Sequence, residues 1–296
     1  VRENIFGIDF DEKSVRVSKM LNLIAGDGHS NVLYLNSIDY DNWDEWIKNE
    51  DWIDIYNDGW KKLKKFRTKK DENGSFEFDI LMANPPFAGD IKESRILARY
   101  ELSKNENDKV QNKVGRDILF IERNLNMLKS GGRMAIVLPD GILTNATLQY
   151  VRDFIMNNFK INAIVSIPQT AFSHYGAGVK CSLLFLTKSI KNKEDYDIFM
   201  AQAEYVGYDA TGREIEQNDL NEIFNNYKNF IEKKNFKLND KCFLIKFNSI
   251  KSNKRIDAGF NKNPYNLVSK YSIVKLKDCI LNKGTYGANE PSIPYN

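Results

Sequence analysis

The chain has 296 residues, with 43 Lys and Arg against 40 Asp and Glu, and a formal net charge of +3. Hydrophobic residues make up 42% of the sequence, which supports a sizeable core and excludes a chain that is disordered throughout. No apolar run approaches the roughly 18 residues of a membrane span. The three cysteines, Cys181, Cys242 and Cys279, lie far apart and are odd in number, which argues against a disulfide framework. The chain has only two histidines, His29 and His174, which argues against a multi-histidine zinc site and a serine-hydrolase triad. We expect a soluble, cytoplasmic protein without a metal site.

The first two-thirds of the chain alternates strand and helix patterns, which indicates an α/β sheet. The predicted strands are 5–9, 31–35, 78–83, 134–138, 161–167 and 179–187, and the predicted helices are 12–25, 117–128 and 147–158. The strand at 78–83 is apolar except for Asp79, as is typical of the centre of a parallel sheet. The strand at 179–187 follows its predecessor closely enough to pair with it by a hairpin-like connection.

Two charged stretches interrupt this alternation. Residues 39–70 are rich in Trp and end in a basic run, 61–70, that includes Leu63 and Phe66. Such a run can contact nucleic-acid phosphate, but a solvated helix face is its commoner use. Residues 88–113 are polar and lack clear periodicity, which predicts a mobile functional loop or a partly disordered segment.

The pattern changes after about residue 190. A charged link at 191–195 precedes a predicted helix at 218–233, a strand at 243–247 and an Asn- and Lys-rich linker at 251–270. A new apolar segment then begins at 273–281. We therefore divide the chain into 1–190, an accessory helical segment and linker at 191–270, and the start of a further domain at 271–296.

The tetrad Asn84-Pro85-Pro86-Phe87 directly follows the strand at 78–83. A tetrad of this type is expected by chance in about 1% of chains of this length. A rigid turn is its simplest structural explanation, because proline fixes φ and removes a backbone donor. However, ligands of open α/β sheets bind at the carboxyl ends of strands, which is where this tetrad lies. We interpret it as part of a functional site.

The tetrad suits chemistry on an aromatic amino group. The lone pair of adenine N6 is delocalised into the ring, so that the nitrogen is a poor nucleophile. Two acceptors aimed at its hydrogens, the Asn84 side-chain oxygen and the Pro85 carbonyl, would favour a pyramidal nitrogen, while Phe87 would stack on the ring. Attack on a sulfonium methyl then requires mainly positioning and charge stabilisation.

Asp9 ends the first predicted strand and precedes a helix. A carboxylate at this place can accept hydrogen bonds from both ribose hydroxyls of a nucleoside cofactor, as in dinucleotide-binding folds. It can equally serve only as a helix cap. Asp9 alone does not decide between these two interpretations.

The tetrad resembles the catalytic motif of amino-group DNA methyltransferases that use S-adenosylmethionine. Further stretches resemble the modification subunit of type I restriction systems, and the similarity covers roughly residues 5–230. These stretches are 115–119 with 131–139, 166–172, 178–186 and 207–214. The resemblance implies a site-specific adenine-N6 DNA methyltransferase with a Rossmann-like, mostly parallel sheet whose last strand is antiparallel. It also implies double-stranded DNA and specificity and restriction subunits, or fused equivalents, as partners.

The resemblance assigns roles to individual residues. Asp9 would bind the ribose of S-adenosylmethionine, with Asn36 or Ser37 near the cofactor's adenine. The residues implied around the target adenine are Asn84, which would also border the cofactor, with Pro85, Pro86 and Phe87. Phe172 is either a second stacking surface or a core aromatic.

The resemblance also predicts what is missing. In the family a strand and a glycine-rich cofactor loop should precede Val1, so that 1–190 corresponds to a truncated catalytic domain. The absent strand would lie between the strands at 5–9 and 78–83, which predicts a gap or a distorted sheet and half a cofactor pocket. Residues 274–278 and 284–287 resemble the opening of a target-recognition domain, as in a polypeptide that fuses modification and specificity parts.

Two alternatives to DNA methylation remain open at this point. The same tetrad suits a methyltransferase acting on an RNA base or a protein glutamine. The chain could also belong to a catalytically silent DNA-binding or assembly subunit.

Overall fold

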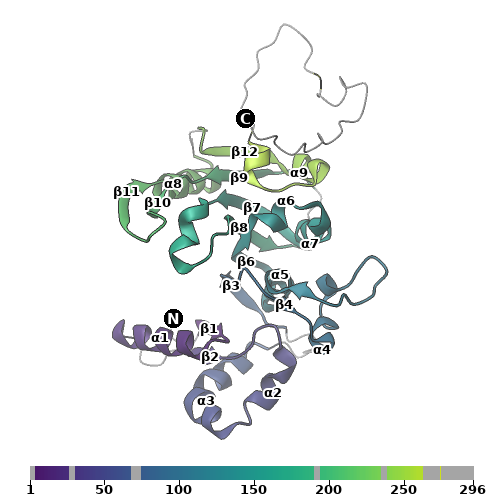
Figure 1. Ribbon diagram of the computed structural model, residues 1–296, viewed down its shortest axis with the longest axis vertical. Coiled ribbons are helices and arrows are strands. Elements are labelled where there is room, and N and C mark those ends of the chain that lie inside the picture. The colour runs from purple at the N-terminus through teal and green to yellow at the C-terminus, as the bar shows by residue number, and fades with distance from the viewer. Residues whose placement is uncertain are drawn as a thin grey trace, which may run out of the picture. The chain divides into compact units, whose positions relative to one another are not determined.

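The computed structural model describes residues 4–26, 31–67, 75–189, 194–234, 239–262 and 274 (Figure 1). The chain divides into two units, Val1–Lys262 and Asn263–Asn296, and all that follows concerns the first. The apolar segment and motif predicted at 273–287 lie outside the described residues, apart from Val274. Within the described part of the chain, no helix is long and apolar enough to span a membrane.

The centre of the first unit is a six-stranded sheet with the order β12-β9-β7-β8-β6-β3. The strands are β3 (Phe78–Ala83), β6 (Leu128–Pro139), β7 (Phe159–Ser166), β8 (Cys181–Lys188), β9 (Asp197–Gln202) and β12 (Cys242–Lys246). β3 pairs with β6 and β7 with β9 in parallel, whereas β8 is antiparallel to both β6 and β7, and β12 to β9. The carboxyl ends of β3, β6, β7 and β9 therefore share one edge. The predicted α/β sheet, with its antiparallel hairpin partner at β8, is confirmed.

Helices cover this sheet with apolar faces that the sequence pattern predicts. α5 (Arg116–Met127) packs against β3 and β6, α7 (Gln149–Asn158) against β7, and α8 (Leu220–Ile231) against β9. The sheet contributes fully buried apolar side chains, such as Ile164 and Leu184. A short helix, α6 (Asp140–Thr144), follows β6.

The N-terminal strands form a separate sheet. β1 (Phe6–Asp9) pairs in parallel only with β2 (Asn31–Tyr34), and α1 (Glu12–Ile24) connects them. Among the described residues no strand lies between β1 and β3, and β3 is the edge strand of the six-stranded sheet rather than a central one. Its side chains Ile80 and Met82, which share one face of the strand, are 57% and 81% exposed.

The Trp-rich insertion folds into helices. It contains the 3₁₀ helix η1 (Tyr40–Asn42), α2 (Trp43–Trp46) and α3 (Glu50–Lys64). The apolar face of α3 is buried, and its members are Trp52, Tyr56, Trp60 and Leu63. The lysines at 61, 64 and 65 are exposed, so the described part of the basic run is a solvated helix face. Residues 68–70 of the run lie outside the described residues.

The prediction of a mobile or partly disordered loop at 88–113 is wrong. β4 (Asp90–Ile91) pairs with β5 (Val114–Gly115), and between them lie α4 (Ser94–Leu97) and the 3₁₀ helix η3 (Glu101–Ser103). The buried members of this segment include Ile96, Leu97, Tyr100 and Leu102. The Glu122 carboxylate accepts hydrogen bonds from the backbone N–H groups of Glu101 and Leu102, at 2.9 and 2.8 Å. Long-range contacts, which leave no periodic signal in the sequence, therefore order this segment.

The residues after 190 also differ from the expected helical segment and linker. β9 and β12 add two strands to the main sheet, and β10 (Val206–Tyr208) pairs with β11 (Glu214–Asn218) in a hairpin. The described part of the predicted linker contains α9 (Phe247–Asn253) and α10 (Ala258–Asn261). Ile256 and Ala258 are fully buried, so these residues belong to the core.

Candidate functional site

The carboxyl edge of the main sheet collects the first group of predicted site residues. The tetrad 84–87 leaves β3 at this edge, and the 3₁₀ helix η5 (Gln169–Tyr175), which carries Phe172, follows β7 at the same edge. β6 and β8 lie between them in the sheet. Segments about 85 residues apart in sequence are thus brought to one side of the fold.

Within the tetrad, the burial alternates. Asn84 and Pro86 are exposed, Pro85 is buried and Phe87 is half-buried. Just after the tetrad, β4 pairs with β5, and the Arg116 N–H donates to the Gly89 carbonyl at 3.1 Å. The tetrad is therefore fixed at both ends, and the Asn84 side chain points from a rigid support toward solvent.

Phe87 and Phe172 are in direct contact. Their ring centroids lie 5.1 Å apart at an interplanar angle of 68°, an edge-to-face pair. Both rings are half-buried and pack against a hydrophobic cluster that includes Ala171 and Val206. The structure thus brings the two predicted stacking residues together, and neither is enclosed in the core.

The predicted cofactor residues form a second group beside β1 and β2. Asp9 is exposed at the carboxyl end of β1, and its carbonyl accepts a hydrogen bond from the Leu35 N–H at 3.0 Å. The helix cap of α1 is Asp11, whose carboxylate accepts from the N–H groups of Lys13 and Ser14. The hydroxyl of Ser14 also donates to it and lowers the pKa of Asp11. Asp11 therefore caps the helix, while one oxygen of the Asp9 carboxylate accepts from the backbone N–H of Asp11 at 2.8 Å.

The loop after β2 is held rigidly. The Asn36 side-chain oxygen accepts from the N–H groups of Ile38 and Asp39, at 3.1 and 3.3 Å, and is therefore committed to its own turn. Each of the three backbone carbonyls at 36–38 accepts a hydrogen bond from a side chain. These pairs are Trp43 Nε1 to Asn36 at 2.7 Å, Arg123 Nε to Ser37 at 2.8 Å, and Tyr100 Oη to Ile38 at 2.7 Å. The loop beside Asp9 is thus preorganised.

Sequence reasoning missed the polar groups between the two aromatic segments. The Ser182 hydroxyl donates to Asp140 at 2.7 Å, and the Lys180 ammonium lies 3.9 Å from the same carboxylate. Burial raises the pKa of Asp140, and these two partners act against that shift. Burial also raises the pKa of Cys181 to about 12, which makes it an inert thiol.

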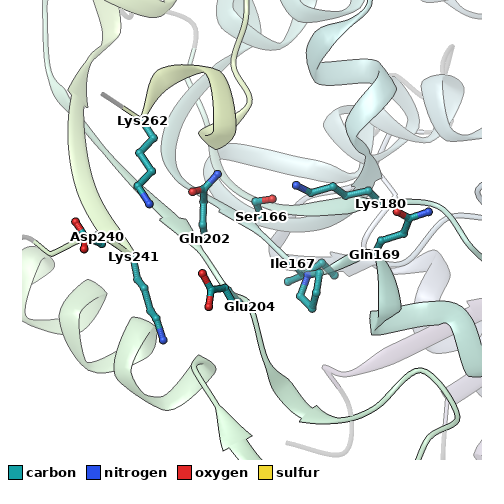
Figure 2. Close-up of a pocket in the computed structure, with 11 residues that line it drawn as sticks. Ser166, Ile167, Gln169, Lys180, Gln202, Glu204, Asp240, Lys241 and Lys262 are labelled. Atoms are coloured by element: carbon teal, nitrogen blue, oxygen red, sulfur yellow. The ribbon is translucent and has the colours of Figure 1, made fainter. Parts of the chain in front are cut away.

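A cleft of about 550 Å³ opens farther along the same edge (Figure 2). Its walls come from the end of β7 and the start of η5, the end of β9 and the residues after it, and the residues just before β8 and β12. Its charged lining residues are Lys180, Lys241, Lys262, Glu204 and Asp240. The Lys241 ammonium is paired with Asp219 at 2.6 Å. The charges nearly balance, so the cleft is not a strong anion site. It could not be found from sequence because its residues come from separate segments.

Metal chemistry has no support from side-chain clusters. Across the ranges that the structure describes, no group of three or more His, Cys, Asp and Glu residues could hold a metal ion.

Comparisons with known proteins identify the family. Residues 1–273 match the family model described as N-6 DNA Methylase. The chain is similar to the type I restriction enzyme EcoEI methylase subunit of Escherichia coli, with 29% identity over 119 residues, 40% of this chain and 22% of the relative.

Two solved structures share the fold. A modification subunit of a type I restriction enzyme from Vibrio vulnificus YJ016 is 21% identical, with a TM-score of 0.56 over 86% of this chain and 46% of the other. A type I restriction-modification methyltransferase subunit from Streptococcus thermophilus is 18% identical, with a TM-score of 0.57 over 86% of this chain and 47% of the other. The chain spans less than half the length of either protein.

Proposed function

Because the chain belongs to the N-6 DNA methylase family, we propose that it acts as an adenine-N6 DNA methyltransferase of a restriction-modification system. The observation that carries this proposal is the tetrad 84–87 at the carboxyl end of β3, with Phe172 in contact with Phe87. The substrate is double-stranded DNA and the cofactor is S-adenosylmethionine. The partners are specificity and restriction subunits or fused equivalents.

The residues beside β1 and β2 fit a nucleoside cofactor. Asp9 offers an exposed carboxylate that can accept hydrogen bonds from two ribose hydroxyls. The preorganised loop at Asn36 and Ser37 lies next to it, on the side where the cofactor's adenine would rest. When bound, S-adenosylmethionine supplies an electrophilic sulfonium methyl.

The residues of the tetrad act on the target base. Adenine N6 cannot react inside the base stack, so the nucleotide is flipped out of the duplex. The Asn84 side-chain oxygen and the Pro85 carbonyl accept hydrogen bonds from the amino group and hold it in place. Phe87 stacks on the ring, and no strong base is needed.

Phe172 forms the opposite wall of the base site. A base stacked between two rings needs contacts of about 3.5 Å on each side, so the centroids must lie about 7 Å apart. The rings are 5.1 Å apart at present and must separate to admit a base. The base site is therefore closed by its own aromatic residues until DNA enters.

Methyl transfer from labelled cofactor tests the proposal directly. The natural full-length protein would be incubated with labelled S-adenosylmethionine and unmethylated duplex DNA, RNA or a protein mixture, with Asn84→Ala as the control. We expect label in DNA as N6-methyladenine. Label in RNA or in a protein glutamine would mean that RNA or protein, rather than DNA, is the substrate, since the tetrad suits any planar amino or amide group.

A catalytically silent DNA-binding or assembly subunit is the second candidate. Duplex binding without transfer to any of the three substrates would select this candidate.

A further inference from the structure

The hairpin of β10 and β11 contains the motif 207–214, which the proposed chemistry leaves without a role. Its turn is tightly specified: the Asp209 carboxylate accepts from the N–H groups of Thr211 and Arg213, at 2.8 and 3.1 Å. Gly207 and Gly212 have φ of +88° and +84°, a region that favours glycine. The motif therefore encodes one defined hairpin rather than a flexible loop.

The base of the hairpin is anchored to the edge of the main sheet. The buried Asp219 carboxylate accepts from the N–H groups of Glu204 and Tyr205, at 2.8 and 3.0 Å, and pairs with Lys241 beside β12. Glu204 and Tyr205 lie between β9 and β10. The hairpin thus projects from a fixed point at the edge that carries the base site.

The hairpin contacts η5, the segment that holds Phe172. The Tyr208 hydroxyl donates to the carbonyl of Ala171 at 3.0 Å, and its ring meets His174 at 4.9 Å in a T-shaped pair. Gly212 lies so close that a Cβ on it would stand 3.2 Å from the His174 ring. These contacts bracket Phe172 on both sides in sequence.

η5 needs external support. It is a seven-residue 3₁₀ helix, and such helices have poor hydrogen-bond geometry and are seldom longer than one turn. It ends at Gly176 with φ of +80°. Phe172 stands on this weak element yet must meet Phe87, which stands on a rigid strand end.

We propose that the β10–β11 hairpin braces η5 and that Tyr208 is a positioning residue, which fixes the backbone that carries Phe172 so that this ring stays opposite Phe87 when the two separate to receive a flipped base. This inference rests on the proposed function of the aromatic pair. It gives the 207–214 motif a role in substrate positioning, with the nucleobase as the ligand. Tyr208 itself touches neither base nor cofactor.

The test compares Tyr208→Phe with Tyr205→Phe in the natural full-length protein. Both substitutions remove one tyrosine hydroxyl, Tyr208 from β10 and Tyr205 from the segment just before it, where the side chain is 44% exposed. With 2-aminopurine at the target position, Tyr208→Phe should lower the flipped-base fluorescence about fivefold, the effect of one hydrogen bond. Turnover, measured on the matching duplex with adenine at that position, should fall by a similar factor. Duplex affinity and the KM for cofactor should stay at the wild-type values, which a general loss of structure would not permit.

Hydrogen exchange tests the brace without DNA. The amides of Ala171, Gly176 and Ala177, which bond within η5 and its exit, should exchange about fivefold faster in Tyr208→Phe and unchanged in Tyr205→Phe. The amides of β6 and β8 serve as an internal reference. Tyr208→Ala, which also removes the ring contact with His174, should show a larger effect in the same direction.

Several results would overturn the inference. Equal behaviour of the two Phe variants removes Tyr208 from the role. Faster exchange of η5 with unchanged flipping and turnover also overturns it, because the hairpin then supports η5 without positioning Phe172. If the wild-type protein methylates no DNA, the proposed function fails, and the exchange data alone still decide whether the brace exists.

Discussion

The two-stranded and six-stranded parts of the first unit carry different halves of the candidate site, and they are packed very differently. In the six-stranded sheet, side chains such as Ile164 and Leu184 are fully buried. In the N-terminal part, α1 has a single buried residue, Val15. The apolar side chains exposed on α1 include Val17, Met20, Leu21 and Ile24. The base side of the site thus has a dense support, and the cofactor side has an open one.

The two parts contact each other through aromatic rings and side-chain hydrogen bonds rather than through paired strands. The Phe6 and Phe78 rings lie 5.8 Å apart, and the Arg95 guanidinium makes two hydrogen bonds of 2.8 Å to the Asp39 carboxylate. Arg123, from α5, holds the Ser37 carbonyl. The loop beside Asp9 is therefore positioned by the main sheet's own helix, although β1 and β2 do not belong to that sheet.

The largest expected effect concerns stability. Leu184→Ala should lower the free energy of unfolding by about 2–5 kcal/mol, because it leaves a cavity among fully buried neighbours. Met82→Ala removes a similar side chain from the exposed edge of β3 and should change the free energy by less than about 0.5 kcal/mol. Urea titrations of residues 1–296 would measure both. Similar losses of unfolding free energy for the two substitutions would mean that the face of β3 that carries Met82 is covered in solution.

The next effect concerns chemistry. Asn84→Ala in the natural full-length protein should lower turnover by about 10²-fold or more, the usual effect of removing one key electrostatic contact. Duplex affinity should change little, since it derives mainly from phosphate contacts elsewhere. Asn221→Ala, an exposed asparagine on α8, is the matched control. A variant with more than about a tenth of wild-type turnover would remove Asn84 from the reaction.

The sequence predicted the parts of the fold that have strong local patterns. β3 was placed at its observed bounds because its apolar residues, interrupted only by Asp79, end at Asn84 and two prolines. The segment at 88–113 was missed because its buried residues are irregularly spaced and are ordered by contacts with Glu122 on a later helix. β9 was missed although residues 198–201 are an apolar run, because the charged stretch before them was interpreted as a link out of the sheet.

The candidate site was predictable to the extent that its residues lie at strand ends. The tetrad, Asp9 and Phe172 follow β3, β1 and β7, and the structure places each of them there. The sequence could not separate Asp9 from Asp11 as the helix cap, because both stand before the same helix. The bracing contact between Tyr208 and Ala171 joins segments 37 residues apart and had no sequence signal.

Phe87 is expected to show an intermediate effect. Phe87→Ala should lose about 1–3 kcal/mol of base binding, while Phe87→Tyr and Phe87→Trp should stay active because each keeps an aromatic face. Because the ring is half-buried, Phe87→Ala should cost less than the roughly 3–5 kcal/mol of stability lost at a core position. Thermal melts beside activity assays separate the two roles. Inactivity that accompanies a collapsed melting temperature would assign Phe87 to the core.

The smallest effect distinguishes Asp9 from Asp11, two carboxylates two positions apart in the sequence on the open side of the molecule. Asp9→Asn keeps one acceptor for the ribose but removes the charge. It should raise the KM for S-adenosylmethionine about fivefold to tenfold, which corresponds to a loss of about 1 kcal/mol or slightly more of binding free energy. Asp11→Asn also preserves the size of the side chain and an oxygen that can cap the helix, so it should leave that KM unchanged. Asp11→Ala removes the cap and should lower the free energy of unfolding by about 0.5–2 kcal/mol, again with little effect on the KM. If Asp11→Asn raised the KM as much as Asp9→Asn, the effect would belong to the local negative charge, and Asp9 would lose its assignment as the ribose ligand.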